Sequence, residues 1–325
     1  MTKSNVIWLA VAALAAIAVP FIIGNEFYIN MATQVLIYAL FALSINMMLG
    51  YGGMVSLGHA GYLGIAGYAC ILLVINGMDQ LSAAIVAVLI STVVAGFFGV
   101  LSLRAPGLGF IMITLAIGQI VWGIAYRAND LTGVDNGIRH PARPMPFGID
   151  IRDATHFYFF TLVVFVIALF FIWRFAHSPF GASLKGAKDQ PRRMTMLGHN
   201  VWMVRWLTFV LAGFWGSVAS ILYVYYNLFL SPHAISLQQS AEILLMAILG
   251  GASTLTGPIV GAAIITLVKN VVSTYVERWN TLLGAIFVLA IIFMPYGLVP
   301  GCRQLWQRIR KKRQSPNAGK PEAAA

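Results

Sequence analysis

Charged residues, cysteines and recognisable catalytic motifs are all scarce in this sequence. Only 10% of the 325 residues are charged, whereas 59% are hydrophobic, a larger apolar fraction than soluble domains contain. The two cysteines lie far apart, Cys70 in an apolar run and Cys302 beside a basic tail, so they indicate neither a disulfide framework nor a thiolate metal site. The composition indicates an all-α polytopic integral membrane protein.

Three kinds of chemical site are also missing. No G-x-x-x-x-G-K-[ST] stretch is present, so the chain does not supply the usual P-loop for nucleotide hydrolysis. There is no H-E-x-x-H, and no paired intramembrane Asp or Glu of the kind that carries protons or sodium through a secondary carrier. We therefore expect this chain to have no enzymatic activity and to bind no metal or cofactor. If the protein transports against a gradient, a partner must supply the energy.

Apolar runs of the length of a membrane span recur along the chain. Eight such runs are present: Val6–Ile23, Ile29–Leu49, Val55–Ile75, Leu81–Leu103, Phe110–Tyr126, Phe157–Phe175, Leu207–Leu228 and Leu282–Val299. We interpret the first as a span rather than a removed signal peptide. A further apolar region, Ala241–Val272, is broken by GGASTLTGP, Gly250 to Pro258, and neither half reaches the roughly 20 residues of a comfortable span. The sequence predicts eight full spans plus a re-entrant pair of half-helices, or ten spans if both halves cross.

The distribution of positive charge predicts the orientation. Placing both termini in the cytoplasm puts 15 of the 21 basic residues inside and seven of the ten acidic residues outside. The opposite orientation would violate the positive-inside bias. Most basic residues sit at membrane boundaries rather than on one folded face, so nucleic acid is not an expected partner.

The largest polar interruption of the second half runs from Arg174 to Arg205. Pro179 is suited to start a new element, and Ala182 to Leu197 can be helical except at Pro191. Gly198 is suited to the left-handed stop after such a helix. The segment is either an ordinary cytoplasmic loop with the usual excess of Lys and Arg, or a docking element through which a soluble partner pushes on the bundle.

Two further segments face water. Residues 127–156 form the largest outer loop, with four basic and four acidic residues and three prolines, and are either a solvated linker or a platform for an external protein. Residues 303–325 form a basic cytoplasmic tail. Its first part suits an anchor on anionic membrane lipids, and its end, after Gln314, is expected to be disordered. Residues 1–302 then make up one transmembrane domain.

Glycine and a few polar residues mark the interior of the first half. The stretch Leu49–Tyr68 contains seven glycines, so helices can approach closely there and the helix can unwind near its start. Ser56 and His59 lie among these glycines, which favours a segment that lines a pathway or a subunit interface. Close helix packing is the alternative, and a lone histidine is more often a packing residue than a metal ligand.

Glu242 is the one acidic residue inside the broken apolar region. It follows the start of a half-helix, where the macrodipole favours a carboxylate. It is either a gating or subunit-contact residue, or a charge at the outer interface. The break itself adds further candidates for the pathway or subunit interface, namely Gly250, Gly251, Thr256 and Gly257.

Three blocks of the sequence resemble one family. YALFALSINMMLGYGGMVSLGHAGYLGIAGY, SPFGASLKGAKDQPRRMTMLGHNVWMVRWLTFVLAG and SAEILLMAILGGASTLTGPIVGA, the last followed by FMPYGLVPG, are similar to the M-type permease subunit of branched-chain amino acid ABC importers. The similarity extends from about Tyr38 to Gly301. It implies a bacterial inner-membrane subunit that pairs with a homologous second permease. Two cytoplasmic ATPase subunits would use ATP and Mg²⁺, and a periplasmic binding protein would deliver the solute.

The resemblance also implies roles within the polar loop. The ATPase-coupling loop of the family corresponds to Gly181–Gly198, and the matching polar and turn positions are Gly181, Lys185, Asp189, Arg192, Arg193 and Gly198. This sequence departs from the family pattern at Met194 to Met196, where small and acidic residues are usual, and at His199. The external binding protein usually sets specificity in such systems, so importers of urea, short amides or sugars stay open as alternatives.

We therefore predict a permease that provides half of an alternating-access pathway for branched-chain or related amino acids. An ion-coupled secondary carrier or channel is the first competing class, and it would need an ion-binding cluster. A membrane enzyme is the second, and it would need convergent polar groups at one depth.

Overall fold

A computed structural model describes most of the membrane region. It covers residues 20, 25–128, 133, 137–140, 153–272, 281, 284, 285, 288 and 297–301. Nearly all of the predicted first span, most of the outer loop 127–156, most of the predicted last span and the tail 303–325 lie outside the described residues.

Five helices in the described part of the chain are long and apolar enough to cross a membrane. They are α2 (Glu26–Asn46, continued by the π-helix η1, Met47–Tyr51), α4 (Gln80–Ser102), α5 (Leu108–Arg127), α7 (Ala154–Ala176) and α10 (Val201–Asn227). Three shorter apolar helices accompany them: α3 (Ala60–Ile75), α11 (Leu237–Gly250) and α12 (Thr256–Val272). The chain is thus an all-α polytopic membrane protein, as predicted, while the choice between eight and ten spans stays a prediction.

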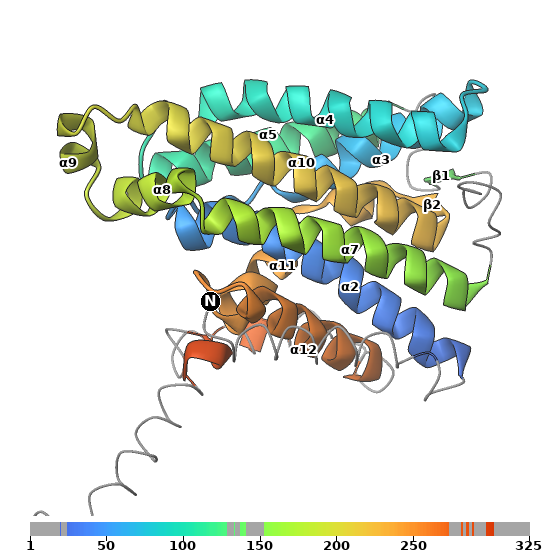
Figure 1. Cartoon of the computed structure of the whole chain (residues 1–325). Coiled ribbons are helices and arrows are strands. Elements are labelled where there is room, and N and C mark those ends of the chain that lie inside the picture. Colours follow the sequence, from blue (N-terminus) through green and yellow to red (C-terminus); the bar gives the residue numbers. More distant parts are fainter. Residues whose placement is uncertain are drawn as a thin grey trace, which may run out of the picture.

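The helix at the centre of the bundle is α2, which packs against α7, α10, α11 and α12 (Figure 1). Every residue from Ile37 to Met48 is buried, as expected for a helix that is apolar on all sides. The helices α4, α5 and α7 instead leave large apolar side chains exposed, among them Val93, Met112 and Phe170. Such faces suit contact with lipid rather than water.

The chain between α2 and α3 is irregular. Residues 52–59 form no helix, and Gly53 has a positive φ of 68°. Gly58 lies so close to the carbonyl of Thr114 on α5 that a side chain would not fit. The predicted span Val55–Ile75 is therefore wrong in its first five residues, although the unwinding that the glycines predicted is present.

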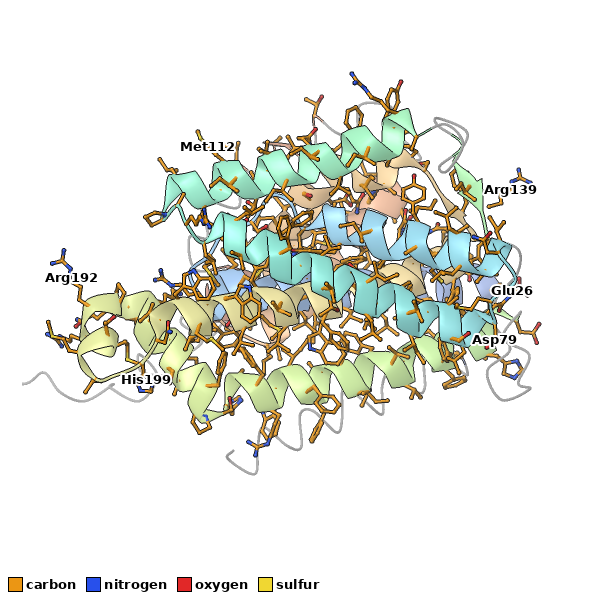
Figure 2. The ribbon with its side chains drawn as sticks, turned by 90° about the horizontal axis from the view of Figure 1, so that it is seen from above. Glu26, Asp79, Met112, Arg139, Arg192 and His199 are labelled. Carbon is orange, nitrogen blue, oxygen red and sulfur yellow. The ribbon has the colours of Figure 1, made fainter. Side chains whose placement is uncertain are left out.

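Polar residues gather at two opposite ends of the bundle. Arg192 and His199 lie at one end, and Glu26, Asp79 and Arg139 lie at the other (Figure 2). The first end carries the short helices α8 (Pro179–Asp189) and α9 (Pro191–Met196). The second carries the antiparallel ribbon of β1 (Ile138–Arg139) and β2 (Phe229–Leu230), followed by the 3₁₀-helix η4 (Pro232–Ile235) (Figure 1). The two polar regions that the charge distribution assigned to opposite sides are therefore at opposite ends.

The helices α11 and α12 are antiparallel neighbours joined by a short turn. This turn meets the end of α2, where the Asn46 amide donates to the carbonyl of Thr254 at 2.9 Å and its oxygen accepts from the amide of Ser253 at 3.1 Å. Beside the turn, Gly250 of α11 lies directly against the carbonyl of Gly257 on α12. Small residues thus let the two backbones approach closely at the break.

This close approach predicts that Gly250 does not tolerate a side chain. A methyl group there would overlap the Gly257 carbonyl, so Gly250→Ala should lower the free energy of unfolding by about 1–3 kcal/mol through overpacking. Thermal unfolding of the purified protein in detergent should show a lower Tm. Gly123→Ala on α5 is the matched control, because nothing lies within 4 Å of an added methyl group there. Equal Tm values for the two variants would contradict the prediction.

Candidate functional site

The segment that links α7 to α10 is an elbow, which consists of α8, α9 and the turn after α9. The Ser178 hydroxyl accepts a hydrogen bond from the amide of Gly181 at 3.2 Å, and Pro179 occupies the first turn, where its missing N–H is not needed. The helix thus begins three residues before the predicted helical stretch. It ends because Gln190, which precedes Pro191, leaves the helical conformation with a φ of -144° and a ψ of 80°, since the helical region is disfavoured before proline.

The turn after α9 has the geometry that the sequence predicts. Gly198 has a φ of 83°, which only glycine adopts readily. Its amide donates to the carbonyl of Thr195 at 3.0 Å, and the amide of His199 donates to that of Met194 at 3.1 Å. This pair of bonds is the Schellman motif, which satisfies the last carbonyls of a helix. The Asn200 side chain then caps the first turn of α10.

One face of α8 is buried, whereas α9 has no buried residue. Gly181, Leu184 and Ala187 of α8 are buried at a spacing of three, and Leu184 packs beside the ends of α7 and η1. No residue of α9 is buried, and the tip of the elbow leaves Met196 85% and Leu197 74% exposed. Two large apolar side chains are thus exposed at a polar end of the molecule.

The four charged residues predicted for the coupling loop all lie on the elbow and are exposed. They are Lys185, Asp189, Arg192 and Arg193. The Lys185 ammonium lies 5.1 Å from the ring centroid of Tyr51, within reach of a cation–π interaction. The structure therefore brings the predicted coupling residues onto one surface element, with Gly181 in its buried face and Gly198 at its last turn.

A hydrogen-bonded junction joins the elbow to the core of the bundle. The carbonyl oxygen of Gly50 accepts from Lys188 Nζ of α8 at 2.9 Å and from the hydroxyl of Ser253 at 2.8 Å. We call these three residues the Gly50 junction. A second tie runs from Arg205 Nη2 of α10 to the carbonyl of Ala187 at 2.9 Å. The elbow is therefore held to α2, to α10 and, through Gly50, to the turn between α11 and α12.

Four predicted pathway residues flank this same turn. Gly251 ends α11 with a φ of 121°, and Thr256 starts α12 as an exposed residue. Gly250, Gly251 and Gly257 are brought together, since added side chains at 250 and 257 would both meet backbone across the turn. Their position beside the Gly50 junction places them in the part of the bundle nearest the elbow.

Ser56 and His59 lie inside the protein. Their exposed fractions are 1% and 0%, so neither contacts lipid. Nε2 of His59 lies 2.7 Å from the hydroxyl of Ser44 on α2, and the histidine ring packs edge-on against Tyr62 at 5.3 Å between centroids. Their part in a pathway stays a prediction.

Glu242 lies in the second turn of α11, where its side chain is 2% exposed. Both carboxylate oxygens are 2.9 Å from Nζ of Lys269 on α12. The same ammonium is 5.9 Å from the ring centroid of Tyr38, and beside it Asn270 donates to Gln34 at 2.9 Å. Glu242 is thus not an exposed charge at an interface, because it is buried and paired with Lys269.

Sequence reasoning missed the partners of these residues. Lys188 and Ser253 bond to Gly50 in the junction, and Asn46 bonds to Ser253 beside it. Lys269 pairs with Glu242 and lies over the ring of Tyr38. The sequence gives one local indication that Lys269 is special, namely that it is a basic residue within the apolar run after the break. Within the residues described here, no group of three or more His, Cys, Asp or Glu side chains lies together as a metal site.

A cavity of about 330 Å³ opens near the end of the bundle that carries the β ribbon. Its lining comprises Tyr223, Asn227, Phe229, Ser231, His233, Ala234 and Gln239. The Tyr223 ring packs edge-on against Tyr38 with centroids 6.3 Å apart. Since Tyr38 also contacts Lys269, the inner wall of the cavity adjoins the surroundings of the ion pair.

Known proteins similar to this chain are membrane permeases. The chain is 24% identical over 326 residues to the high-affinity branched-chain amino acid transport system permease protein LivM of Salmonella typhimurium, with 93% of this chain and 76% of the relative covered. It is 24% identical over 314 residues to a probable branched-chain amino acid transport permease protein LivM of Methanocaldococcus jannaschii, with 81% of this chain and 90% of the relative covered. It is 26% identical over 228 residues to the autoinducer 2 import system permease protein LsrC of Salmonella paratyphi B, with 67% of this chain and 64% of the relative covered. No solved structure gives a significant match.

The family match extends over nearly all of the described helices. Residues 27–294 match the family described as "Branched-chain amino acid transport system / permease component". This range includes α3 to α12 in full, together with the elbow, the Gly50 junction and the Glu242–Lys269 pair. The chain therefore belongs to the branched-chain amino acid transport system permease family and is a membrane permease component of an ABC transporter.

Proposed function

We propose that this chain forms half of the translocation pathway of an ATP-driven importer for branched-chain amino acids. The observation that carries the proposal is the elbow, whose tip exposes Met196 and Leu197 while its base is bonded to the core through Lys188 and Gly50. An element that is exposed at its tip and fixed at its base is suited to receive a push from a soluble partner.

The proposed assembly supplies what the chain lacks. A homologous second permease would complete the pathway, and two cytoplasmic ABC ATPase subunits would bind the elbows and hydrolyse ATP with Mg²⁺. A periplasmic binding protein would deliver the solute to the end that carries the β ribbon. The chain itself would hold no cofactor and perform no covalent chemistry.

The elbow would act as a lever. When the ATPase moves α8, the Lys188–Gly50 bond would carry the movement to the end of α2, and Ser253 would carry it to the turn between α11 and α12. Both contacts are hydrogen bonds to one carbonyl, so the three elements cannot move independently without leaving a buried polar group unpaired.

The names of the relatives support an amino acid as the solute. Two of them are branched-chain amino acid permeases by name. The match to a permease of an autoinducer 2 import system favours a broader family, so import of urea, a short amide or another small polar solute is the second candidate. A secondary carrier or channel is less well supported, because the carboxylate of Glu242 is already neutralised by Lys269.

We propose that the protein lies in the bacterial inner membrane with the elbow and both termini in the cytoplasm. Cysteine labelling tests this orientation in a background without Cys70 and Cys302. A membrane-impermeant maleimide should label Met78→Cys, at the end opposite the elbow, in intact spheroplasts. Ser183→Cys on α8 and Ser315→Cys in the tail should react only after permeabilisation. Labelling of Ser183→Cys in intact spheroplasts would reverse the orientation.

Gly198→Val should uncouple ATP hydrolysis from uptake while the protein still inserts. A β-branched residue disfavours the left-handed backbone at this position by about 1–2 kcal/mol, so the chain would enter α10 at a changed angle. The measurement is the stimulation of ATPase activity by loaded binding protein in reconstituted vesicles. Lys185→Ala is the control: an exposed charge contributes about 1 kcal/mol or less, so this variant should only weaken the complex. Normal stimulation in Gly198→Val would remove the lever from the mechanism.

The exposed tip should bind the ATPase through apolar contacts. Replacing both Met196 and Leu197 by alanine should weaken ATPase binding by about tenfold or more, since each large apolar side chain buried in an interface contributes about 1.5–3 kcal/mol. Binding of the purified ATPase to permease in detergent can be measured by titration. Met112→Ala, on the exposed face of α5, should leave the affinity unchanged. Wild-type affinity in the double variant would place the docking surface elsewhere.

A further inference from the structure

The Glu242–Lys269 ion pair joins two membrane helices. The carboxylate is almost fully buried, whereas the lysine side chain is 29% exposed, so the pair is accessible from the lysine side. By contrast, the His156–Asp153 pair is exposed at the start of α7. The pair between α11 and α12 therefore differs from the surface charges of the molecule.

Burying a charge pair at this position costs free energy, so its presence suggests a function. Ionisable side chains within the hydrocarbon region are rare and usually face a bundle interior or an aqueous cavity. A buried ion pair is often no more stabilising than apolar residues of similar volume. Packing alone is therefore a weak reason for the presence of Glu242 and Lys269.

Polar residues connect the cavity with the pair. Gln239 lines the cavity and lies three residues before Glu242 on α11, so it is on the same side of the helix, about 4.5 Å along the axis. Tyr223 also lines the cavity and packs on Tyr38, whose ring contacts the Lys269 ammonium. A solute that entered the cavity would therefore meet the ion pair next, after displacement of Gln239 or Tyr223.

We propose that Glu242 and Lys269 form a partner-exchange site for a zwitterionic solute, an α-amino acid. The ammonium group of the solute pairs with the Glu242 carboxylate, and its carboxylate pairs with the Lys269 ammonium. This inference rests on the proposed import function and deepens it, because it names the charge pattern of the solute that the pathway accepts.

The exchange keeps every charge paired. Before entry, the protein holds one ion pair and the solute is hydrated. After entry, the solute contributes one positive and one negative group, so two ion pairs replace one and no charge is left alone in a medium of low dielectric constant. Tyr38, at 5.9 Å from the lysine ammonium, supplies a cation–π contact that holds Lys269 while Glu242 changes partner. An uncharged solute such as urea gains nothing from this arrangement.

The alternative role for the pair is a clasp that holds α11 against α12. A clasp is damaged when one charge is removed, because the other charge is left buried and unpaired, and it is restored when both are replaced by neutral side chains. An exchange site is lost in both cases. The double variant Glu242→Gln with Lys269→Met therefore separates the two roles.

The experiment measures ATP-driven uptake of labelled leucine in vesicles that contain the complete importer. With the wild type active, the double variant should lower uptake by at least about tenfold, while the Tm of the permease and its co-purification with the ATPase stay at wild-type values. A matched control removes the neighbouring neutral pair by Gln34→Leu with Asn270→Leu, and it should keep uptake within about twofold of the wild type.

A charge-conserving variant keeps the test valid if the neutral pair does not assemble. Lys269→Arg retains the charge, and its guanidinium can grip Glu242 through two hydrogen bonds. The exchange site then predicts slower uptake by about threefold or more without a lower Tm, whereas a clasp predicts unchanged or faster uptake.

The outcomes separate the inference from the proposed function. Wild-type uptake in the assembled double variant, or in Lys269→Arg, would overturn the exchange site and leave amino acid import standing. A complete wild-type importer that takes up no leucine but does take up urea or another uncharged solute would overturn the proposed substrate class and, with it, the exchange site.

Discussion

The fold depends on one constraint: where a helix breaks inside a membrane, its free backbone groups must find partners within the protein. Two breaks meet at the end of α2, namely its own irregular end and the turn between α11 and α12. Each break supplies partners for the other. Asn46 bonds to both Ser253 and Thr254 of the turn, and the Ser253 hydroxyl bonds back to the Gly50 carbonyl. The breaks are therefore stable together, and moving one segment alone would leave polar groups unpaired.

The same constraint connects the water-facing elbow with the membrane core. The Gly50 carbonyl has two lone pairs, and one of them accepts from Lys188 of the elbow while the other accepts from the turn. A long lysine side chain can reach a carbonyl at the membrane boundary with its apolar stem packed along the way; here the stem lies against Gly53. An arrangement that satisfies a local hydrogen-bonding requirement thus also provides a rigid contact between the elbow and two membrane segments.

Local features were predictable from the sequence, whereas long-range pairings were not. Pro191 and Gly198 act through their own backbone preferences, so the break and the left-handed stop of the elbow could be read directly. The glycines after Leu49 predicted an unwound segment, but only its contact with α5 explains why the helix starts five residues late. Asn46 and Ser253 are 207 residues apart, and no local pattern connects them. The pairing of Glu242 with Lys269 likewise depends on how α11 folds back onto α12.

The helix α11 connects the proposed exchange site with the turn that the elbow reaches through Gly50. The helix α11 is continuous from Leu237 to Gly250. Its end beside the Gly50 junction is therefore about 12 Å from Glu242 along the helix axis. A helix of this length resists bending, because its hydrogen bonds run parallel to its axis. A displacement of the turn by the elbow would therefore shift Glu242 relative to Lys269, which sits on the opposing helix. Movement of the elbow could in this way change whether the Glu242 carboxylate pairs with Lys269 or with the solute. ATP hydrolysis would then act on the solute although the ATPase does not touch it.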